Sequence, residues 1–423
     1  MPEHKWIKQL QLPEKLEKAA AAALRLVESE WAAVDSIAFA NQRRILEAFQ
    51  KVRLGEEDFQ DSSGYGYHDR GREKLEAVFA DAFQSEAALV RTQIVSGTHA
   101  LTVALFGLLR PGDLLYCLTG EPYDTLQAVI GSLGSEAGSL HEWGINYRFH
   151  HPNAEGRIDP QSLDSTLRPK VAYIQRSAGY SLDRTALTEK ELAELIAQAR
   201  RLYPQAWIVV DNCYGEFVSD REPAALGADL VVGSLIKNPG GGLAPGGGYM
   251  AGRKELIHQI AARLTAPGLY GNLGATSGKR SLFQGIFMAP NLVSNALKNA
   301  IFAAAFFELL GYEVRPRYNE PRGDIVQVII LKSAERVERF CRAIQAASPV
   351  ESHVTPVPGD LPGYRDPVIM AAGTFHQGAS AELSADAPLR EPYAVFLQGA
   401  LTLPHALWAT GQAALALESG DGP

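Results

Sequence analysis

Two short apolar runs near the middle of the chain most restrict what it can fold into. Residues 208–210 end at Asp211, and residues 229–232 are followed by Ser234 and then by Lys237. Unbroken apolar runs of this length are typical of strands buried on both faces of a parallel sheet. Because α/β proteins place their chemistry at the carboxyl ends of such strands, the sequence predicts that Asp211 and Lys237 face one bound ligand.

An acid and a lysine at neighbouring strand ends suit a pyridoxal phosphate site. A lysine can hold the aldehyde as a Schiff base, and the cofactor then acts as an electron sink. We predict Lys237 as this amine, Asp211 as the carboxylate against the ring nitrogen, and Ser234 as a hydroxyl for the phosphate. Solvated or capping side chains are the ordinary alternative for such a pair, so the hypothesis depends on the other parts that a cofactor needs.

The composition excludes several classes of protein. The chain has 423 residues, 46% of them hydrophobic, which suits a globular protein of two or three domains. Its net charge of −8 argues against partners such as nucleic acids or anionic membranes. Three widely spaced cysteines fit neither a disulfide framework nor a zinc site. The first residues do not resemble a secretion signal and no apolar run is long enough to span a membrane, so we expect a cytoplasmic protein.

Three segments are expected along the chain. Residues 1–60 read as a helical arm, residues 61–290 as a large cofactor-binding α/β domain, and residues 291–423 as a linking helix with a small α+β domain. Alternating strand and helix patterns across residues 87–250 predict a largely parallel sheet. Further elements are expected as helices at 16–27, 41–52, 291–310 and 334–347, and as strands at 324–331, 368–372 and 393–397.

A candidate phosphate site lies between a predicted strand and an apolar helix, at Ser96, Gly97 and Thr98. A helix N-terminus supplies unpaired backbone N–H groups, a glycine allows close approach, and hydroxyls add donors. An ordinary helix cap is the alternative for this pattern. Tyr123 follows the next strand and precedes another helix, where its ring could stack on a pyridine or simply pack on its neighbours.

Four further residues are weaker candidates. Tyr65 and Tyr67 lie in a glycine-rich loop at 62–67 and could reach a phosphate, although a plain surface loop is the alternative. Gln175 ends the strand predicted at 171–174 and is a candidate substrate contact. Arg390 could bind a substrate carboxylate with two hydrogen bonds, or it could be an ordinary surface arginine. No metal-binding or complete nucleotide-binding motif is found.

Together these segments resemble fold-type-I pyridoxal phosphate enzymes of the cystathionine lyase group. The closer match is to the branch of aluminium-resistance or methionine γ-lyase-like proteins, over about residues 60–400. The resemblance is carried by the stretches GYGYHDRGREKLE, SGTHA, GEPYDTL, YIQRS-GYS, VDNCYGEF, GSLIKNPGGGLAPGGGY and FQGIFMAP.

The resemblance implies a role for each candidate. Lys237 would form the Schiff base, Asp211 would meet the ring nitrogen and Tyr123 would stack on the ring. Cys213 would lie beneath the ring, and Gly97, Thr98 and Ser234 would hold the phosphate. In this group a tyrosine and an arginine of the early loop often reach the phosphate of a neighbouring subunit. Tyr65 and Tyr67 occupy that place here, and Arg70 is a candidate for the arginine. A homodimer or homotetramer with shared active sites is therefore expected.

The expected activity is carbon–sulfur bond cleavage by β- or γ-elimination. The substrate would be a small sulfur-containing amino acid such as cystathionine, methionine or cysteine. Because one fold hosts many reactions, a pyridoxal phosphate-dependent aminotransferase is the alternative. A cofactor-binding stress or regulatory protein with little turnover is a second alternative.

Overall fold

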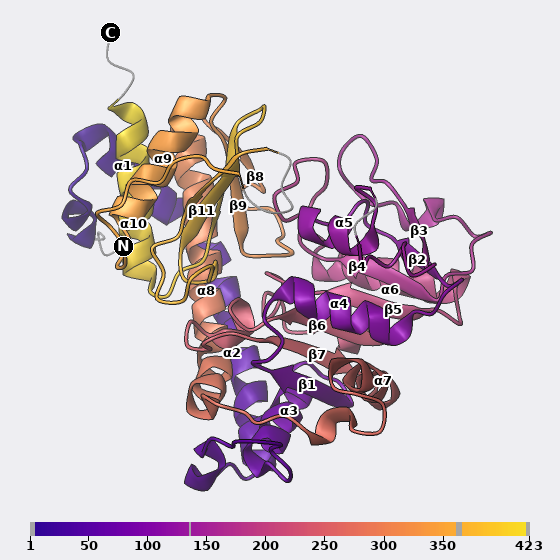
Figure 1. The fold of residues 1–423 in the computed structure, drawn as a ribbon. Coiled ribbons are helices and arrows are strands. Elements are labelled where there is room, and N and C mark those ends of the chain that lie inside the picture. Colours follow the sequence, from indigo (N-terminus) through magenta and orange to yellow (C-terminus); the bar gives the residue numbers. More distant parts are fainter. Residues whose placement is uncertain (1–4, 135–136, 361–365, 420–423) are drawn as a thin grey trace. The chain divides into compact units, whose positions relative to one another are not determined.

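A mostly parallel sheet of seven strands runs through Ala40–Ala289 in the computed structural model, which describes residues 5–134, 137–360 and 366–419 (Figure 1). Strand β7 runs antiparallel to both of its neighbours, β1 and β6, while the remaining pairs are parallel. The α/β class predicted from the sequence is confirmed. In spatial order the strands are β1 (Ala87–Arg91), β7 (Gly248–Gly252), β6 (Leu230–Ser234), β5 (Trp207–Asp211), β4 (Val171–Gln175), β2 (Leu114–Cys117) and β3 (Asn146–Phe149).

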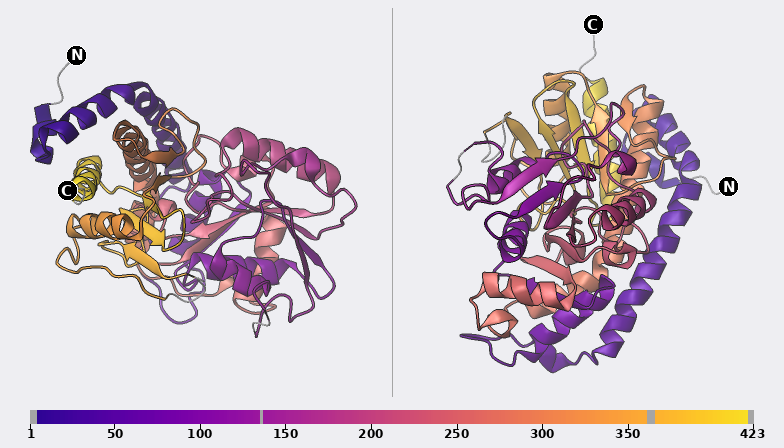
Figure 2. Two further views of the ribbon diagram at one scale, coloured as in Figure 1. Left: turned by 90° about the horizontal axis from the view of Figure 1, so that it is seen from above. Right: turned by 90° about the vertical axis from the view of Figure 1, so that its right-hand side faces the viewer.

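Both faces of this sheet are buried, which explains the unbroken apolar runs. Side chains alternate along β5, so Val209 packs in one core cluster while Ile208 and Val210 pack in the other. Helices α4 and α6 cover opposite faces, as the left view of Figure 2 shows. Helices that lie wholly in this unit are α3 (Arg70–Ala82), α4 (Gly97–Leu108), α5 (Asp124–Ile130), α6 (Glu189–Leu202) and α7 (Lys254–Leu264).

Strand β7 was not predicted, because its glycine-rich sequence reads as part of a loop. Close packing explains the glycines instead. A Cβ atom on Gly248 would lie 2.6 Å from Ile94 Cγ2, and one on Gly252 would lie 2.3 Å from the carbonyl oxygen of Asp229. Glycine is therefore required here because neighbouring chain segments approach a strand closely.

Helix α8 (Lys279–Leu309) is longer than expected, and the predicted start at Pro290 is wrong. Proline lacks a backbone N–H and removes one hydrogen bond from a helix interior. Here buried residues continue on both sides of it, with Ile286 and Ala289 before and Leu292 after, so packing outweighs that loss. Among the described residues α8 is the single helix long and apolar enough to cross a membrane, but 78% of its most apolar window is buried, as in a core helix.

The remaining unit combines Met1–Phe39 with Pro290–Pro423 and contains an antiparallel sheet. The predicted smaller α+β part is confirmed, whereas strands β8 and β11 and helix α10 were missed. Its strands in spatial order are β10 (Val368–Ala371), β11 (Ser384–Pro388), β12 (Ala394–Gln398), β9 (Val326–Ile330) and β8 (Glu313–Arg315). Its helices are α1 (Glu14–Leu26), α9 (Ala334–Ala346) and α10 (Leu403–Glu418).

The boundaries between the two units fall within α8 and α2 (Glu28–Lys51). Helix α2 begins well before the helix predicted at 41–52. The N-terminal residues through Phe39 group with the C-terminal part. The domain limits at residues 60 and 290 stay predictions.

Candidate cofactor site

Asp211 ends β5 and is buried beside β6, the strand that precedes Lys237. Its carboxylate accepts hydrogen bonds at both oxygens, from the backbone N–H of Cys213 at 3.1 Å and from the hydroxyl of Tyr173 at 3.2 Å. Burial raises the pKa of the Asp211 carboxyl, and the nearby Lys237 partly opposes this. A proton shared with a ligand's ring nitrogen is the chemistry that such a carboxyl suits.

The amine of Lys237 lies over the ring of Tyr214, with Nζ 3.7 Å from the ring centroid. Burial lowers the pKa of the Lys237 amine, but Cys213, Tyr214 and Asp211 together raise it by more. The pKa of Lys237 is therefore well above its ordinary value. Lys237 and Asp211, which were predicted from the two strand ends, are therefore close enough for each to shift the pKa of the other.

Three predicted phosphate and ring contacts converge at the N-terminus of α4. A Cβ atom on Gly97 would lie 3.3 Å from Ser234 Cβ and 3.5 Å from Cys213 Sγ. Ser96 caps the helix, its hydroxyl accepting a hydrogen bond from His99 N–H at 3.0 Å. Glycine therefore lets the helix N-terminus, with its unpaired backbone N–H groups, approach Ser234 and Cys213 closely.

Tyr123 is held at both ends. Its hydroxyl and that of Thr98 lie 3.0 Å apart, and its backbone N–H donates to Gln175 Oε1 at 3.0 Å. Burial raises the pKa of Tyr123, as do Asp211 and Cys213. The ring is therefore a neutral, positioned aromatic surface, and Gln175 is connected to the site through it.

These residues fit pyridoxal phosphate. One edge of the sheet provides an amine, a buried acid, an aromatic ring, hydroxyl groups and a helix N-terminus that begins with a glycine, which are the parts that the cofactor's aldehyde, ring nitrogen, ring face and phosphate need. The roles assigned to Ser96, Gly97, Thr98, Tyr123, Gln175, Asp211, Cys213, Ser234 and Lys237 stay predictions. Within the described residues, no cluster of three or more His, Cys, Asp or Glu side chains could hold a metal.

Two other candidates of this unit are not brought to the group. Tyr65 and Tyr67 are 72% and 59% exposed, and their rings pack on each other with centroids 5.7 Å apart. Arg390 belongs to the other unit, in which it forms an ion pair with Asp366 at 3.1 Å. Their assignments also stay predictions.

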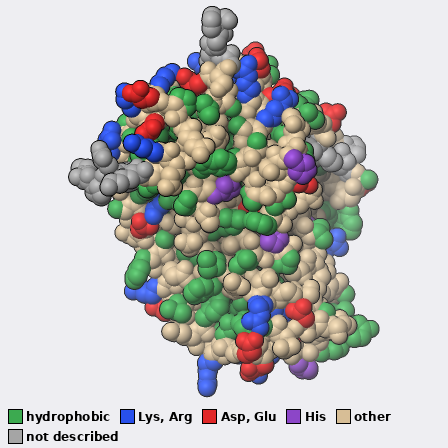
Figure 3. All heavy atoms as spheres, turned by 90° about the vertical axis from the view of Figure 1, so that its left-hand side faces the viewer, with side chains coloured by type: hydrophobic (Ala, Val, Ile, Leu, Met, Phe, Trp, Pro, Cys, Tyr) green, Lys and Arg blue, Asp and Glu red, His purple; other side chains and the backbone are tan. Residues whose placement is uncertain are grey.

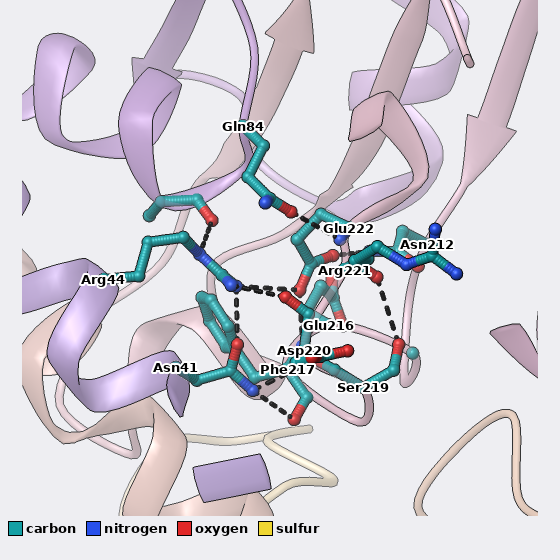
Figure 4. Close-up of polar contacts among 12 residues, drawn as sticks. Asn41, Arg44, Gln84, Asn212, Glu216, Phe217, Ser219, Asp220, Arg221 and Glu222 are labelled. Carbon is teal, nitrogen blue, oxygen red and sulfur yellow. Dashed lines mark hydrogen bonds and ion pairs between the residues drawn. The ribbon is translucent and has the colours of Figure 1, made fainter. Parts of the chain in front are cut away.

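A buried polar network supports the segment that follows β5 (Figure 4). Glu222 accepts hydrogen bonds from Asn212 Nδ2 and from the backbone N–H of Phe217, each at 2.9 Å, and lies 3.9 Å from the Arg44 guanidinium of α2. Asn41, also on α2, donates to the carbonyl oxygens of Phe217 and Ser219 at 3.1 Å. Helix α2 thus contributes directly to the position of the chain beside Asp211.

The sequence analysis missed two residues in this segment. Tyr214 faces Lys237, and the fully buried Glu216 accepts a hydrogen bond from Tyr249 at 3.0 Å. Both lie in the VDNCYGEF stretch directly after Asp211, so their nearness in sequence to the predicted acid could have identified them.

The family described as methionine gamma-lyase matches residues 16–417. An uncharacterized protein of Bacillus subtilis (strain 168), YnbB, is 46% identical over 376 residues, covering 88% of this chain and 89% of that protein. The crystal structure of a carbon-sulfur lyase involved in aluminum resistance from Clostridium novyi NT is 44% identical, with 97% of both chains covered and a TM-score of 0.91. L-methionine gamma-lyase of Pseudomonas putida is 31% identical over 191 residues, covering 44% of this chain and 42% of that protein.

A more distant structure shows the fold alone. The pyridoxal-5'-phosphate dependent protein YhfS of Escherichia coli is 18% identical, covers 90% of this chain and 96% of that one, and has a TM-score of 0.61. The fold of that protein agrees with the fold type expected from the motifs. The match to residues 16–417 spans nearly the whole sequence, and the chain belongs to the methionine gamma-lyase family.

Proposed function

We propose that this protein is a pyridoxal phosphate-dependent carbon–sulfur lyase acting on a small sulfur-containing amino acid such as cystathionine, methionine or cysteine. The observation that carries the proposal is that Asp211 ends β5 and Lys237 follows the adjacent strand β6, close to the N-terminus of α4 at Gly97. The family and the relative from Clostridium novyi NT, whose name states carbon–sulfur cleavage, support it.

Each side chain has a task in such a reaction. Lys237 Nζ would bind the cofactor covalently and, once released, would take the proton from the substrate's α-carbon. Asp211, as a carboxylate, would stabilise a protonated ring nitrogen, because an opposite charge in a buried place favours the charged form of that nitrogen. When bound, pyridoxal phosphate would supply the electron sink that makes the α-proton acidic and lets the sulfur-bearing group leave.

The first test is the absorbance spectrum of the purified protein before and after borohydride, followed by peptide mass mapping. We expect a visible cofactor band and a reduced adduct on Lys237. Lys237→Ala should abolish both, while Lys190→Ala, which changes an exposed lysine of α6, should leave them intact. A featureless spectrum that added cofactor does not restore would contradict the proposal.

The second test distinguishes the reactions. Purified protein is supplied separately with cystathionine, methionine and cysteine, and keto acid, ammonia and thiol or sulfide are measured. Elimination predicts that all three products appear without an added acceptor. Amino-group transfer to an added keto acid, without release of sulfur, would instead show an aminotransferase, and a bound cofactor with no response to any amino acid would favour the stress or regulatory alternative.

We also propose that the protein works in the cytoplasm as a homodimer or homotetramer. Several large apolar side chains of Ala40–Ala289 are exposed, including Tyr65 and Leu46. Figure 3 shows hydrophobic side chains exposed among charged ones on one face, and exposed apolar groups can pack against a partner. Sedimentation of the purified protein tests the assembly, and a monomer at all concentrations would contradict it.

A further inference from the structure

Tyr214 occupies a strained position beside the candidate site. Its φ is 70° and that of Phe217, three residues on, is 60°, so two residues with bulky side chains lie in the left-handed region within one short segment. Residues other than Gly, Asn and Asp rarely adopt this backbone conformation. Such strain persists only where the surrounding structure enforces it. The position of the Tyr214 ring is therefore imposed by the rest of the fold.

Buried hydrogen bonds impose it from both sides of Tyr214. Arg176 donates to Asn212 Oδ1 at 3.0 Å and to the carbonyl oxygen of Gly215 at 2.7 Å. Further along, the N–H of Phe217 is bound by Glu222 at 2.9 Å. The backbone immediately before and after Tyr214 is thereby fixed.

The same segment is also bound to the chain that carries Lys237. Asn238, the next residue after the lysine, donates from Nδ2 to the carbonyl oxygen of Glu216 at 2.9 Å. The Glu216 carboxyl in turn accepts from Tyr249 on β7. Lys237 and Tyr214 are therefore held in register, and the amine lies over the ring face at 3.7 Å from its centroid.

An ammonium over an aromatic face is attracted by the ring's quadrupole, and the attraction is stronger where water is excluded. The other groups that face this amine are Asp211, Cys213, Glu216 and Tyr123. The carboxyl of Asp211 is committed to two hydrogen bonds of its own, from Cys213 N–H and the Tyr173 hydroxyl. The Tyr214 side chain also accepts a hydrogen bond from the Lys237 amine, so both the ring face and the hydroxyl of Tyr214 can hold the ammonium.

We propose that the face of the Tyr214 ring is the holding site for the protonated amine of Lys237 whenever that amine is not attached to the cofactor. Tyr214 is thus a positioning residue that keeps the amine at one place between its release and its return. The inference rests on the proposed function for the role of Lys237, but the contact itself can be tested in protein freed of cofactor.

The experiment measures the pH dependence of acetic anhydride labelling at Lys237, by mass spectrometry, in the full chain freed of cofactor. The matched pair is Tyr214→Phe, which keeps the ring face, and replacement of Tyr214 by pentafluorophenylalanine, which keeps the shape but reverses the ring's quadrupole. Tyr214→Leu removes the ring. Removing the attraction destabilises the ammonium, so the fluorinated and leucine proteins should have about tenfold more neutral amine at a given pH.

The expected pattern is a midpoint about one pH unit lower for the fluorinated and leucine proteins, and a clearly smaller decrease for Tyr214→Phe, which loses only the hydrogen bond of the hydroxyl. Labelling of the exposed Lys190 should keep one midpoint throughout and serves as the reagent control. Equal midpoints at Lys237 in all the proteins would overturn the proposal. A shift in Tyr214→Phe as large as in the fluorinated protein would also overturn it, because the hydroxyl would then be responsible.

The labelling result is independent of catalysis. If the protein binds no cofactor, the proposed function fails while the midpoint shift can still be observed. If cofactor binds and protects Lys237 from labelling but the midpoints are equal in its absence, the proposed function stands and the role of Tyr214 fails.

Discussion

Two regions of the same unit were expected to serve one site, and the structure builds them in opposite ways. In the segment after β5, residues 211–222, Asp211, Glu216 and Glu222 are buried and their carboxyl groups accept hydrogen bonds from several elements. In the early loop, residues 62–67, the side chains of Tyr65 and Tyr67 are exposed. One region is fixed through its side chains, whereas the other presents them to its surroundings.

The early loop is nevertheless anchored through its backbone. Tyr65 O accepts a hydrogen bond from the N–H of Gly274 at 3.0 Å, and the buried Arg72 donates to the carbonyl oxygens of Gly66 and Gly274. A fixed backbone with exposed aromatic side chains is compatible with the predicted contribution of Tyr65 and Tyr67 to a neighbouring chain's site. The difference teaches that one chain brings the amine and the acid together through buried contacts, whereas the tyrosines of the loop keep the exposure that the predicted contribution to a partner's site needs.

The largest expected effect is in the buried segment and depends on pH. Burial raises the pKa of Glu216 to about 8, so the folded chain keeps a proton that the unfolded chain releases above the ordinary value of 4.5. The contribution of this protonated carboxyl to stability is complete below about pH 4.5 and is lost as pH rises to about 8. At about 1.4 kcal/mol per pH unit, the free energy of unfolding should fall by about 5 kcal/mol across this window.

Urea unfolding at several pH values measures how steeply the free energy of unfolding falls with pH. Glu216→Gln cannot titrate but keeps an oxygen that can accept the hydrogen bond from Tyr249. The difference in slope between the two proteins isolates Glu216 from other carboxyls. Identical slopes would show that Glu216 is already ionised when folded, and the account of this segment would need revision.

The next largest effect is the loss of stability on removing Glu222 from the buried polar network. Glu222→Ala leaves the Arg44 guanidinium without its ion-pair partner and removes the acceptor of Asn212 and Phe217, and should cost about 3–5 kcal/mol of stability. Tyr65→Ala in the early loop should change stability by no more than about 0.5 kcal/mol. Chemical denaturation measures both.

A double variant sharpens this test. Arg44→Met combined with Glu222→Ala removes both charges, so it should recover part of the loss if an unpaired buried charge causes it. Equal costs for Glu222→Ala and Tyr65→Ala would remove the distinction between the two regions.

A third effect concerns chemistry at the start of the buried segment. Asp211→Ala should still allow some cofactor to bind, because Lys237 and the α4 N-terminus remain, but turnover should fall about 100- to 1000-fold, or about 3–4 kcal/mol. Rates of keto acid release measure the loss, and the visible spectrum measures binding. Asp211→Asn, which keeps the shape, is the matched control and should lose as much. Full activity in either variant would refute the assigned role.

Much of the fold could be predicted because local pattern and final environment agree. Val209 and its neighbours are apolar on both faces of the sheet, and Ser96 caps the helix that its position predicted. Strand β7 could not be recognised from its sequence, because its glycines are not residues that favour strands. They are needed because Ile94 and Asp229 approach the strand closely. Helix α8 continues through Pro290 because burial on both sides outweighs one missing hydrogen bond.

The candidate site divides in the same way. Asp211, Gly97 and Lys237 follow strands or begin a helix, so the periodicity of the sequence alone locates them. Tyr214 and Glu216 depend on a strained turn and on partners far away in the chain, such as Tyr249. No local sequence pattern predicts that a tyrosine will adopt a positive φ, because tertiary hydrogen bonds enforce this backbone conformation.

The smallest effect bears most directly on the early loop. If Tyr65 and Tyr67 complete a neighbour's phosphate site, Tyr65→Phe or Tyr67→Phe should weaken cofactor affinity about fivefold, the worth of one hydrogen bond, without changing stability. The loss should appear only at protein concentrations where chains associate, which fluorescence titration combined with sedimentation can establish. Mixing chains that carry Lys237→Ala with chains that carry both tyrosine changes should restore a site of wild-type affinity, because the lysine and the tyrosines come from different chains. A loss of affinity that is equal at every concentration, with no restoration on mixing, would mean that the loop serves its own chain, and the two regions would then differ only in exposure.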